Sequence, residues 1–427
     1  MFIMSKKINS ILKEVLDKIK PSKKELEEIE DSLGIFLKKF KKSMEDLGIE
    51  ADIFIGGSSA KNTLIKKDYY DVDVFIRFPK ERGEAISNLT EKILKNVSKY
   101  SVIHGSRDYF KIKATQNLII ELIPVIKVKN NKEAVNITDL SFFHVKYINK
   151  KIKSEITLDD IRLAKAFCYA NKCYGAESYV QGFSGYGLEL LVYYYKTFIK
   201  FIKAMAKIKG KTIIDIEKHY KNKQAVLMDL NSSKLHSPII LIDPTYKQRN
   251  ALAALSQETF DRFKKECENF LKNPSEKSFE IKKTDLEKIK KEAEKKKYEF
   301  ILLEADTNKQ EGDVAGSKLL KFYKHFSSEI ENFFEIKNRG FSYNGKKSAR
   351  YFFVVKGKPG VLYSGPKLKD IKNVKAFKKK HKSTFVKSGR IYAKEKVDFK
   401  IGEFIENWKK KNKDKIKEMS IKELKFL

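Results

Sequence analysis

Near the start of the chain, a buried strand, a sharp turn and an acidic strand follow one another within 28 residues, from Ala51 to Phe78. The turn is G-G-S-S, residues 56–59, where the backbone can reverse sharply and point its N–H groups at an anion. Asp71-Val72-Asp73 then opens the apolar run Val74–Phe78. Because residues two apart in a strand lie on one face, the two aspartates point the same way while Val72 points into the core. Neighbouring carboxylates repel each other, so the pattern favours a divalent cation that neutralises them.

A third carboxylate lies in a later strand. Asn117–Lys129 reads N-L-I-I-E-L-I-P-V-I-K-V-K, a strongly apolar segment interrupted by Glu121. Burying a charge in such a segment is costly unless the charge is paired or binds a metal. Asp71, Asp73 and Glu121 could therefore hold two Mg²⁺ ions about 3.5–4 Å apart, which activate an attacking hydroxyl and stabilise a leaving pyrophosphate. The alternative is that Asp71 and Asp73 only cap the end of a strand.

Length and charge limit the class of protein. The 427 residues are too many for one typical domain and indicate about three. Lys and Arg number 90 against 56 Asp and Glu, which gives a formal charge of +34. Such an excess favours a polyanionic partner, because the release of counterions drives association with phosphates. A lysine-biased proteome explains part of the charge, but not the interleaving of Lys and Arg with Phe and Tyr in the last third.

The cysteines and the hydropathy pattern indicate the compartment. Cys168, Cys173 and Cys267 form no disulfide framework and favour a reducing environment. Cys168 and Cys173 fall on a predicted helix without a nearby His, so buried thiols are expected there in place of a zinc site. No apolar run is long enough to cross a membrane, and the N-terminus lacks a signal-peptide core. We expect a cytoplasmic protein without a membrane partner, and the sequence leaves a homodimer open.

The hydrophobic periodicity predicts an α+β multidomain protein. Residues 1–150 are expected to form a small mixed sheet with helices on one face, residues 151–275 a mainly helical central domain, and residues 276–427 an α+β body and tail. Ser5–Gly48 is predicted to form two helices that break at Pro21, the second opening with a capping box at Ser22. The further elements expected in the first part are strands at Ile53–Ile55, Tyr100–Gly105, Tyr109–Ala114 and Leu118–Val128, helices at Ala60–Ile65 and Glu84–Ser98, and a hinge at Asp139–Lys151.

The central and C-terminal parts carry their own signals. In the central part we expect helices at Thr157–Asn171 (capped by Thr157 and Asp160), Gly182–Lys209 and Phe260–Leu271, a strand at Ile239–Asp243 and a turn at Pro244–Asn250. In the last part we expect helices at Asp285–Lys297 and Val314–Lys337, the latter ended by Gly340, a strand at Tyr298–Glu304, and strand pairs around Asn344-Gly345 and Ser388-Gly389.

Together, the glycine–serine turn and the two acidic strands resemble the nucleotidyltransferase superfamily related to DNA polymerase beta. Within it, Y-G-A-E-S-Y-V-Q-G-F-S-G-Y-G-L-E-L-L-V-Y-Y-Y at Tyr174–Tyr195 resembles the central domain of archaeal (class I) CCA-adding enzymes, as does I-D-P-T-Y-K-Q-R-N-A-L-A-A-L-S at Ile242–Ser256. The likeness covers nearly the whole chain in matching order. It implies a polymerase-beta-like head, and a C-terminal third that clamps tRNA by shape and phosphate contact.

The resemblance also implies roles for single residues. Asp71, Asp73 and Glu121 match the metal set, although the family often has Glu first and usually Asp third. Ser58, with Ser59 beside it, matches the serine that binds the nucleotide triphosphate, and Lys61 stands where a basic residue, often Arg, is usual. His144, Lys165 and Tyr174 match positions that hold the incoming nucleotide. Arg249 matches the arginine that helps to read the incoming base together with the tRNA backbone.

The activity that the resemblance implies is template-independent addition and repair of the 3′-terminal CCA of tRNA, from CTP and ATP, by two-metal nucleotidyl transfer with Mg²⁺. A poly(A) polymerase-like enzyme that shares the head is one competing interpretation, against which the two quoted blocks argue. A catalytically inactive tRNA-binding relative is another, which the unusual order of carboxylates keeps open.

Overall fold

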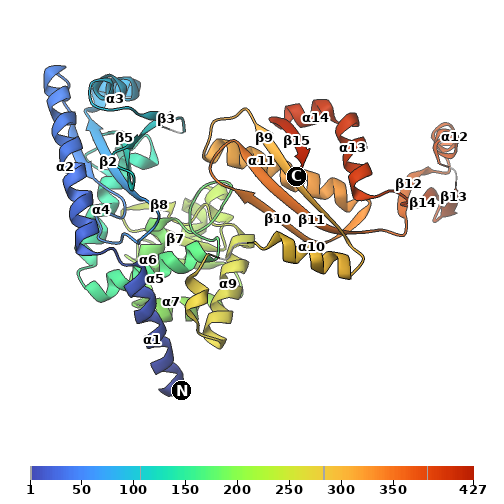
Figure 1. Ribbon diagram of the computed structural model, residues 1–427, viewed down its shortest axis with the longest axis horizontal. Coiled ribbons are helices and arrows are strands. Elements are labelled where there is room, and N and C mark those ends of the chain that lie inside the picture. The colour runs from blue at the N-terminus through green and yellow to red at the C-terminus, as the bar shows by residue number, and fades with distance from the viewer. Residues whose placement is uncertain (1, 106, 282–283, 382) are drawn as a thin grey trace. The chain divides into compact units, whose positions relative to one another are not determined.

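The computed structural model describes residues 2–105, 107–281, 284–381 and 383–427. The chain separates at residues 282 and 283 into two compact units, each with its own sheets and helices (Figure 1). The predicted α+β multidomain architecture is confirmed. Short 3-10 helices lie at Lys80–Ala85, Asn131–Glu133, Ile137–Leu140, Ser232–Leu235 and Glu276–Phe279.

The first part of unit 1 is a five-stranded mixed sheet covered by helices. Its strands run in the order β1-β2-β5-β4-β3, where β2 and β5 are parallel and the other neighbours antiparallel. Its elements are α2 (Lys23–Asp46), β1 (Asp52–Ile55), β2 (Tyr70–Phe78), α3 (Ile86–Lys95), β3 (Ser101–Ile103), β4 (Tyr109–Lys113) and β5 (Leu118–Ile126). One face of the sheet forms a hydrophobic core with α2 and α3, in which Val72 and Ile120 are fully buried. The opposite face is free to carry polar side chains.

The second part of unit 1 is mainly helical and has its own core. Its elements are α4 (Ser141–Lys151), α5 (Glu155–Ala170), α6 (Gly185–Tyr195), α7 (Phe198–Lys207), β6 (Thr212–Asp215), α8 (Lys223–Asp229), β7 (Ile239–Asp243), β8 (Tyr246–Asn250) and α9 (Gln257–Lys272). The N-terminal helix α1 (Phe2–Ile19) buries Ile8, Leu12 and Val15 in this core, although it precedes the sheet in the chain. The domain boundary expected at residue 150 therefore stays a prediction. Helix α1 lies before that boundary in the sequence but packs in the core of the second part.

Several expectations for unit 1 are wrong. Ala60–Ile65 forms turns and no helix; Asn62 has a φ of +52°, which a right-handed helix excludes. The expected hinge at Asp139–Lys151 is largely helix α4, and buried Asp139 accepts a hydrogen bond from Ile126 N at 2.9 Å. The head is therefore joined to the central part by an ordered element.

The central helices also differ from the prediction. Gly182–Lys209 is two helices, because Lys196 takes a φ of +74° and Thr197 caps α7. Helix α5 begins at Glu155 after Ser154, two residues before the predicted cap at Thr157. The predicted strand Ile239–Asp243 is confirmed as β7, but the expected turn at Pro244–Asn250 contains β8, which pairs antiparallel with β7.

Unit 2 contains a four-stranded antiparallel sheet in the order β10-β11-β9-β15, against which α11 packs (Figure 1). A separate sheet, β12-β14-β13, carries α12. The elements are α10 (Leu286–Lys295), β9 (Glu299–Thr307), α11 (Asp313–Glu331), β10 (Phe334–Tyr343), β11 (Ser348–Gly357), β12 (Val361–Lys367), α12 (Ile371–Lys380), β13 (Thr384–Lys387), β14 (Arg390–Glu395), α13 (Ile401–Lys411), α14 (Lys413–Glu418) and β15 (Ile421–Phe426).

The hairpin predictions in unit 2 are confirmed, and one helix end is wrong. Tyr343 pairs with Ala349 across the Asn344-Gly345 turn, and Lys387 pairs with Arg390 across Ser388-Gly389. Helix α11 ends at Glu331 instead of Lys337, and Gly340 lies within β10. A Cβ on Gly340 would lie 2.0 Å from the Phe352 ring, so the glycine serves close strand packing and not a helix end.

The three cysteines are buried and free, which confirms the expected buried thiols. Among the described residues, no helix combines the length and the apolar composition that a membrane crossing needs.

Glu25 completes the capping box predicted at Ser22. Its carboxylate accepts from Ser22 N at 2.8 Å and pairs with Lys66 Nζ at 2.9 Å. The Ser22 backbone N–H, then Lys66 and the Ser22 hydroxyl, lower the pKa of Glu25 from 4.5 to about 2. A carboxyl whose pKa falls on folding stabilises the protein above its unfolded pKa and loses that contribution as the pH falls toward the folded pKa.

We predict that Glu25→Gln lowers the free energy of unfolding at neutral pH by about 1 kcal/mol, since a cap interaction is weakened. Denaturant titration should show this difference shrinking as the pH falls from 4.5 toward 2. Glu27→Gln, at an exposed position of the same helix, is the matched control and should leave stability nearly unchanged. A loss of stability that is equal at all pH values would contradict this role of the Glu25 charge.

Candidate active site

The register between β2 and β5 brings the predicted carboxylates to one face of the sheet. In this parallel pair Asp73 lies opposite Glu121, and Asp71 lies opposite Ile119. Paired residues of parallel strands point to the same side, so Glu121 shares a face with both aspartates. Their neighbours Val72 and Ile120 point into the core. The structure therefore brings together three carboxylates that are far apart in the sequence.

The carboxylates on this face are partly buried and repel one another. Burial, and then the negative charge of Glu121, raise the pKa of Asp71, and the same two causes raise that of Asp73 to about 7. Glu121 Oε1 forms an ion pair with Lys111 Nζ on β4 at 2.8 Å. Although the three carboxylates share a face, no three Asp, Glu, His or Cys side chains among the described residues lie close enough together to hold a metal ion. The mutual repulsion of these carboxylates nonetheless fits a site that a cation would stabilise.

The glycine turn after β1 packs directly against Asp73. Gly56 N donates to Asp73 O at 2.8 Å. Gly57 has a φ of +58°, and a Cβ at this position would lie 1.7 Å from Asp73 Oδ2. Only glycine can bring the backbone this close to the carboxylate. The turn that the sequence suggests for anion binding is thus held beside the acidic face.

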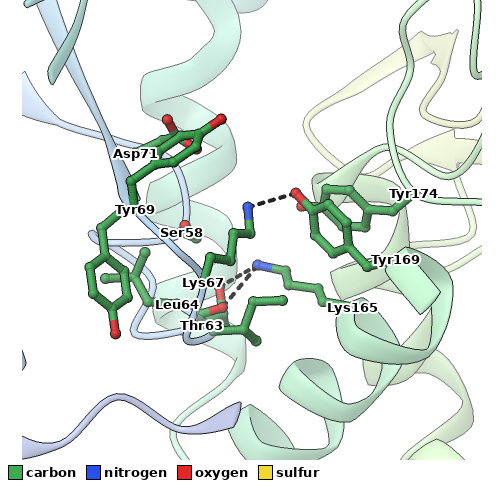
Figure 2. Close-up of a pocket in the computed structure, with 11 residues that line it drawn as sticks. Ser58, Thr63, Leu64, Lys67, Tyr69, Asp71, Lys165, Tyr169 and Tyr174 are labelled. Carbon is green, nitrogen blue, oxygen red and sulfur yellow. Dashed lines mark hydrogen bonds between the residues drawn. The ribbon is translucent and has the colours of Figure 1, made fainter. Parts of the chain in front are cut away.

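A pocket next to Asp71 collects several of the predicted residues (Figure 2). Ser58, Asp71, Lys165 and Tyr174 all contribute to its wall. The remaining lining residues are Thr63, Leu64, Ile65, Lys67, Tyr69, Tyr70 and Tyr169. Side chains with phosphate-binding chemistry therefore meet beside a carboxylate of the acidic face.

The aromatic wall of this pocket has a defined geometry. The rings of Tyr169 and Tyr174 are stacked at 4.1 Å between centroids. Lys67 Nζ donates to Tyr169 OH at 2.7 Å, and Figure 2 shows this bond across the pocket. A Cβ on Gly185, at the start of α6, would lie 2.8 Å from Tyr174 OH, so the helix start leaves room for this hydroxyl.

Lys61 and Lys165 share one buried carboxylate, which the sequence analysis did not single out. Lys61 Nζ lies 2.7 Å from Glu189 Oε2, and Lys165 Nζ lies 3.0 Å from Glu189 Oε1. Thr63 Oγ1 also donates to Glu189 at 3.2 Å. Burial, opposed by the Glu189 charge, lowers the pKa of Lys165 to about 8. Both predicted phosphate-binding lysines are thus oriented by an acidic residue of α6.

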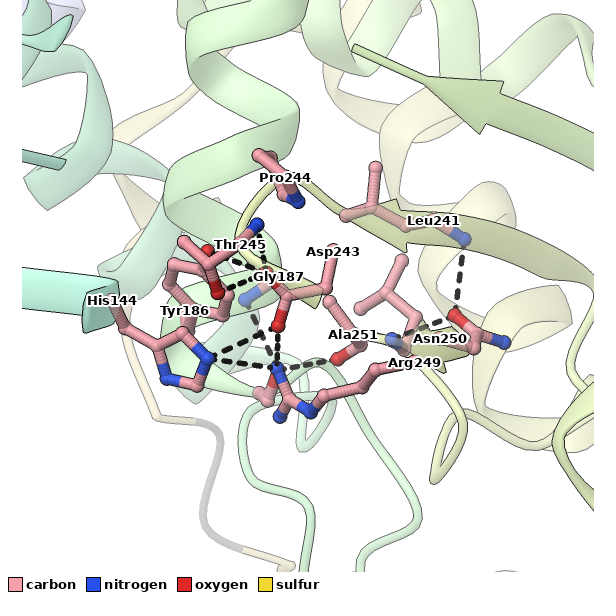
Figure 3. A network of polar contacts seen from close by, with 12 residues as sticks. His144, Tyr186, Gly187, Leu241, Asp243, Pro244, Thr245, Arg249, Asn250 and Ala251 are labelled. Atoms are coloured by element: carbon pink, nitrogen blue, oxygen red, sulfur yellow. Dashed lines mark hydrogen bonds and ion pairs between the residues drawn. The ribbon is translucent and has the colours of Figure 1, made fainter. Parts of the chain in front are cut away.

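His144 and Arg249 meet in a second network, around Asp243 (Figure 3). Asp243 Oδ2 lies 3.0 Å from His144 Nε2 and 2.7 Å from Arg249 Nη1. Tyr186 OH donates to the other carboxylate oxygen at 3.1 Å, and the His144 ring stacks on Tyr186 at 4.1 Å. Burial lowers the pKa of His144 and would raise that of Asp243, but His144 and then Arg249 hold the Asp243 pKa well below its usual range.

The two networks are neighbours. Lys61 Nζ lies 5.9 Å from the centre of the Tyr186 ring, and the charge of Lys61 acts on both Asp73 and His144. Ser59 lies in the turn beside Ser58. The described residues that line the pocket of Figure 2 do not include Ser59, Lys61, His144 or Arg249. The predicted nucleotide-binding residues therefore form two adjoining groups.

A signal for Glu189 was present in the sequence. It lies in the apolar run L-E-L-L-V at residues 188–192, and a charge inside such a run demands a partner, as at Glu121. Asp243, predicted only as the last residue of a strand, is likewise a buried charge at the end of the apolar strand β7.

Comparison with known families agrees with this geometry. The family described as a nucleotidyltransferase domain matches residues 37–155, which contain the acidic face and the glycine turn. The family described as the second domain of tRNA nucleotidyltransferase matches residues 159–280. Nearly all of unit 1 is thus similar to the first two domains of tRNA nucleotidyltransferases.

Similar proteins narrow the family. The CCA-adding enzyme of Nanoarchaeum equitans is 43% identical over 49% of this chain, an alignment that spans 52% of that relative. The CCA-adding enzyme of Methanocaldococcus jannaschii is 29% identical over 90% of this chain and 87% of its own length. The chain is therefore similar to archaeal CCA-adding enzymes over most of its length.

A solved structure of the Cid1 poly(U) polymerase is similar in fold alone. It superposes with a TM-score of 0.51 at 14% identity, over 65% of this chain and 99% of that chain.

We predict that Gly57→Ala reduces nucleotidyl transfer at least about a hundredfold, because its Cβ would displace the Asp73 carboxylate. Gly48→Ala is the matched control: Gly48 has a φ of +60° but no neighbouring atom within 4 Å of its Cβ, so it bears the same backbone strain without the collision. Steady-state rates and melting temperatures of both variants should separate the two effects. Equal losses of activity would show that strain, and not the contact with Asp73, is responsible.

Proposed function

We propose that this protein adds and repairs the 3′-terminal CCA of tRNA from CTP and ATP, without a nucleic-acid template. The observation that supports this most is the strand register that places Asp73 opposite Glu121, beside a glycine–serine turn and two lysines. The chain in which this site lies is similar to tRNA nucleotidyltransferases. In the proposed reaction, the terminal hydroxyl oxygen of tRNA bonds to the α-phosphorus of the nucleotide. The bond from that phosphorus to the bridging oxygen breaks, and pyrophosphate leaves.

Residues of this chain have distinct parts in the proposal. Ser58, Ser59 and the lysines Lys61 and Lys165 bind the triphosphate, with Tyr174 supplying a hydroxyl. His144 and Arg249 face the nucleotide from the second network, where Arg249 reads the base. Arg249 Nε is buried and has no hydrogen-bond partner among the described residues, as expected of a group that awaits a ligand.

Nucleotidyltransferases of this polymerase-like family generally depend on divalent metal, and the acidic face fits such an ion because burial and the charge of Glu121 raise the pKa of both Asp71 and Asp73. We propose that Asp71, Asp73 and Glu121 hold Mg²⁺, for which Glu121 must release Lys111. Bound there, two Mg²⁺ ions would make the attacking hydroxyl more acidic and offset the charge of the departing pyrophosphate. Aspartate at position 71 and glutamate at position 121 place the longer side chain on β5, within reach of Lys111.

Unit 2 is proposed to hold the tRNA. Helix α12, I-K-N-V-K-A-F-K-K-K, ends in three consecutive lysines, and β13 and β14 each carry one aromatic residue together with basic ones, in T-F-V-K and R-I-Y-A-K-E. Such surfaces bind phosphates and stack on exposed bases without reading sequence.

The test is incubation with a tRNA that ends at the discriminator base. CTP alone should add two residues, ATP alone should add none, and both together should complete CCA. Incorporation of ATP alone would instead support a poly(A) polymerase-like enzyme. Binding of tRNA without pyrophosphate release would support an inactive relative. This outcome should be measured because the ion pair with Lys111 occupies Glu121, a proposed metal ligand.

We predict that Asp73→Asn abolishes turnover, by about a thousandfold or more, while tRNA affinity changes less than about twofold, since in the proposal Asp73 takes part in chemistry and residues of unit 2 hold the tRNA. Asp52→Asn, which alters a half-exposed carboxylate of the same sheet paired with Lys127, is the control and should keep full activity. Turnover of Asp73→Asn close to that of the unaltered protein would contradict the role of the acidic face.

We also predict that tRNA affinity falls steeply with salt, by about a thousandfold or more between roughly 50 and 200 mM monovalent salt. Counterion release from the phosphates is the reason, and filter binding measures it. A nearly flat dependence would show that the excess of Lys and Arg is not used for RNA.

A further inference from the structure

Two buried carboxylates, Glu189 and Asp243, have no part in the chemistry proposed above, yet each is bonded to residues that we assign to nucleotide binding. We infer that they are positioning residues with separate tasks: Glu189 places the lysines that bind the triphosphate, and Asp243 places the His144–Arg249 pair that faces the base. The inference rests on the proposed function and deepens it, since it divides nucleotide recognition between two anchors.

Glu189 connects the two parts of unit 1. Its side chain is 1% exposed and receives Lys61 and Thr63 from the turn after β1, at 2.7 and 3.2 Å. From the other side, Lys165 of α5 reaches the second carboxylate oxygen at 3.0 Å. Lys165 Nζ also donates to Thr63 Oγ1 at 2.7 Å, as Figure 2 shows. One carboxylate thus fixes two ammonium groups that come from different layers of the structure.

Removing this charge would leave the lysines without a common partner. Lys61 and Lys165 are 8% and 3% exposed, so water cannot replace Glu189, and two buried like charges repel each other. Although burial raises its pKa, the two lysines lower the pKa of Glu189 overall, so the anchor is charged. Since CTP and ATP carry the same triphosphate, misplacement of these lysines should weaken the binding of both nucleotides equally.

Asp243 is the corresponding anchor of the second network (Figure 3). It is fully buried, and its Oδ1 accepts from Thr245 N and Thr245 Oγ1, both at 2.8 Å, and from Tyr186 OH at 3.1 Å. Its Oδ2 is bonded to both His144 and Arg249. The carboxylate is itself rigidly held and can therefore fix the orientation of the guanidinium.

The orientation of Arg249 matters for the base in particular. Asp243 binds Nη1, while Nε has no hydrogen-bond partner among the described residues, so this donor stays available to a ligand. The edges of cytosine and adenine present different acceptor positions. A guanidinium that is free to turn should therefore change the relative use of CTP and ATP, which loss of Glu189 should not do.

The experiment compares Glu189→Gln with Asp243→Asn. Steady-state kinetics would use CTP on tRNA that lacks CCA, and ATP on tRNA that ends in CC. For Glu189→Gln we expect KM to rise about ten- to a hundredfold for both nucleotides, as for loss of a charged hydrogen-bonded partner, with their ratio of kcat/KM unchanged within about twofold. For Asp243→Asn we expect that ratio to change by about tenfold or more.

Three variants test alternatives to positioning. Glu189→Asp, which keeps the charge, should recover part of the lost affinity. Glu217→Gln removes a carboxylate that pairs with Lys151 at 2.8 Å outside both networks, and should leave KM and the ratio unchanged. Where Asp243→Asn does not fold, Tyr186→Phe removes a single hydrogen bond to Asp243 and should shift the ratio in the same direction.

The inference is overturned if Glu189→Gln changes the CTP-to-ATP ratio as much as Asp243→Asn does. It is also overturned if both variants only lower the melting temperature and leave KM and the ratio unchanged, because the carboxylates would then be purely structural. If the unaltered protein adds neither nucleotide, the proposed function fails separately. In that case the dissociation constants of CTP and ATP for the same variants, measured by calorimetry, decide the inference. They should rise equally for both nucleotides in Glu189→Gln and unequally in Asp243→Asn.

Discussion

The parallel pairing of β2 with β5 is the constraint on which the site depends. The first half of each strand alternates between buried and partly exposed residues, and the buried side of both strands packs against α2 and α3. A slip of one residue would turn Glu121 into the core and Ile120 out of it. Burial of Val72 and Ile120, both at 0% exposure, therefore fixes the register that puts Asp73 beside Glu121. Hydrophobic packing on one face determines the chemistry on the other.

Around this face, acidic and basic side chains alternate in space. Asp73 lies near Lys61, Lys61 is bonded to Glu189, and Glu189 is bonded to Lys165. The second network repeats the arrangement with Asp243 between His144 and Arg249. Lys61, Lys165 and Arg249 each have a carboxylate partner, which is the condition for burying charge at acceptable cost. Such a site can hold charged groups in place before an anionic nucleotide and its metal arrive, and this preorganisation is what transfer at phosphorus requires.

Much of this could be predicted from the sequence, because local patterns determine it. Three features depend only on neighbours in the chain: the alternation in Asp71-Val72-Asp73, the single charge of Glu121 in an apolar strand, and the capping box at Ser22. The errors have tertiary causes. Ala60–Ile65 has helix-compatible residues but forms turns, in which Lys61 and Thr63 reach Glu189 of α6. Lys196 breaks the predicted long helix with a positive φ that its sequence does not signal. The packing of α1 against α5 joins segments more than a hundred residues apart, a contact that local periodicity cannot show.

The most direct test of this account is a crystal structure of the protein with Mg²⁺ and a CTP analogue that cannot transfer its nucleotidyl group. We expect metal density between Asp71, Asp73 and Glu121, with Glu121 released from Lys111 and the triphosphate contacting Lys61 and Lys165. Density for the metal or the triphosphate elsewhere, with the Glu121–Lys111 ion pair intact, would contradict it.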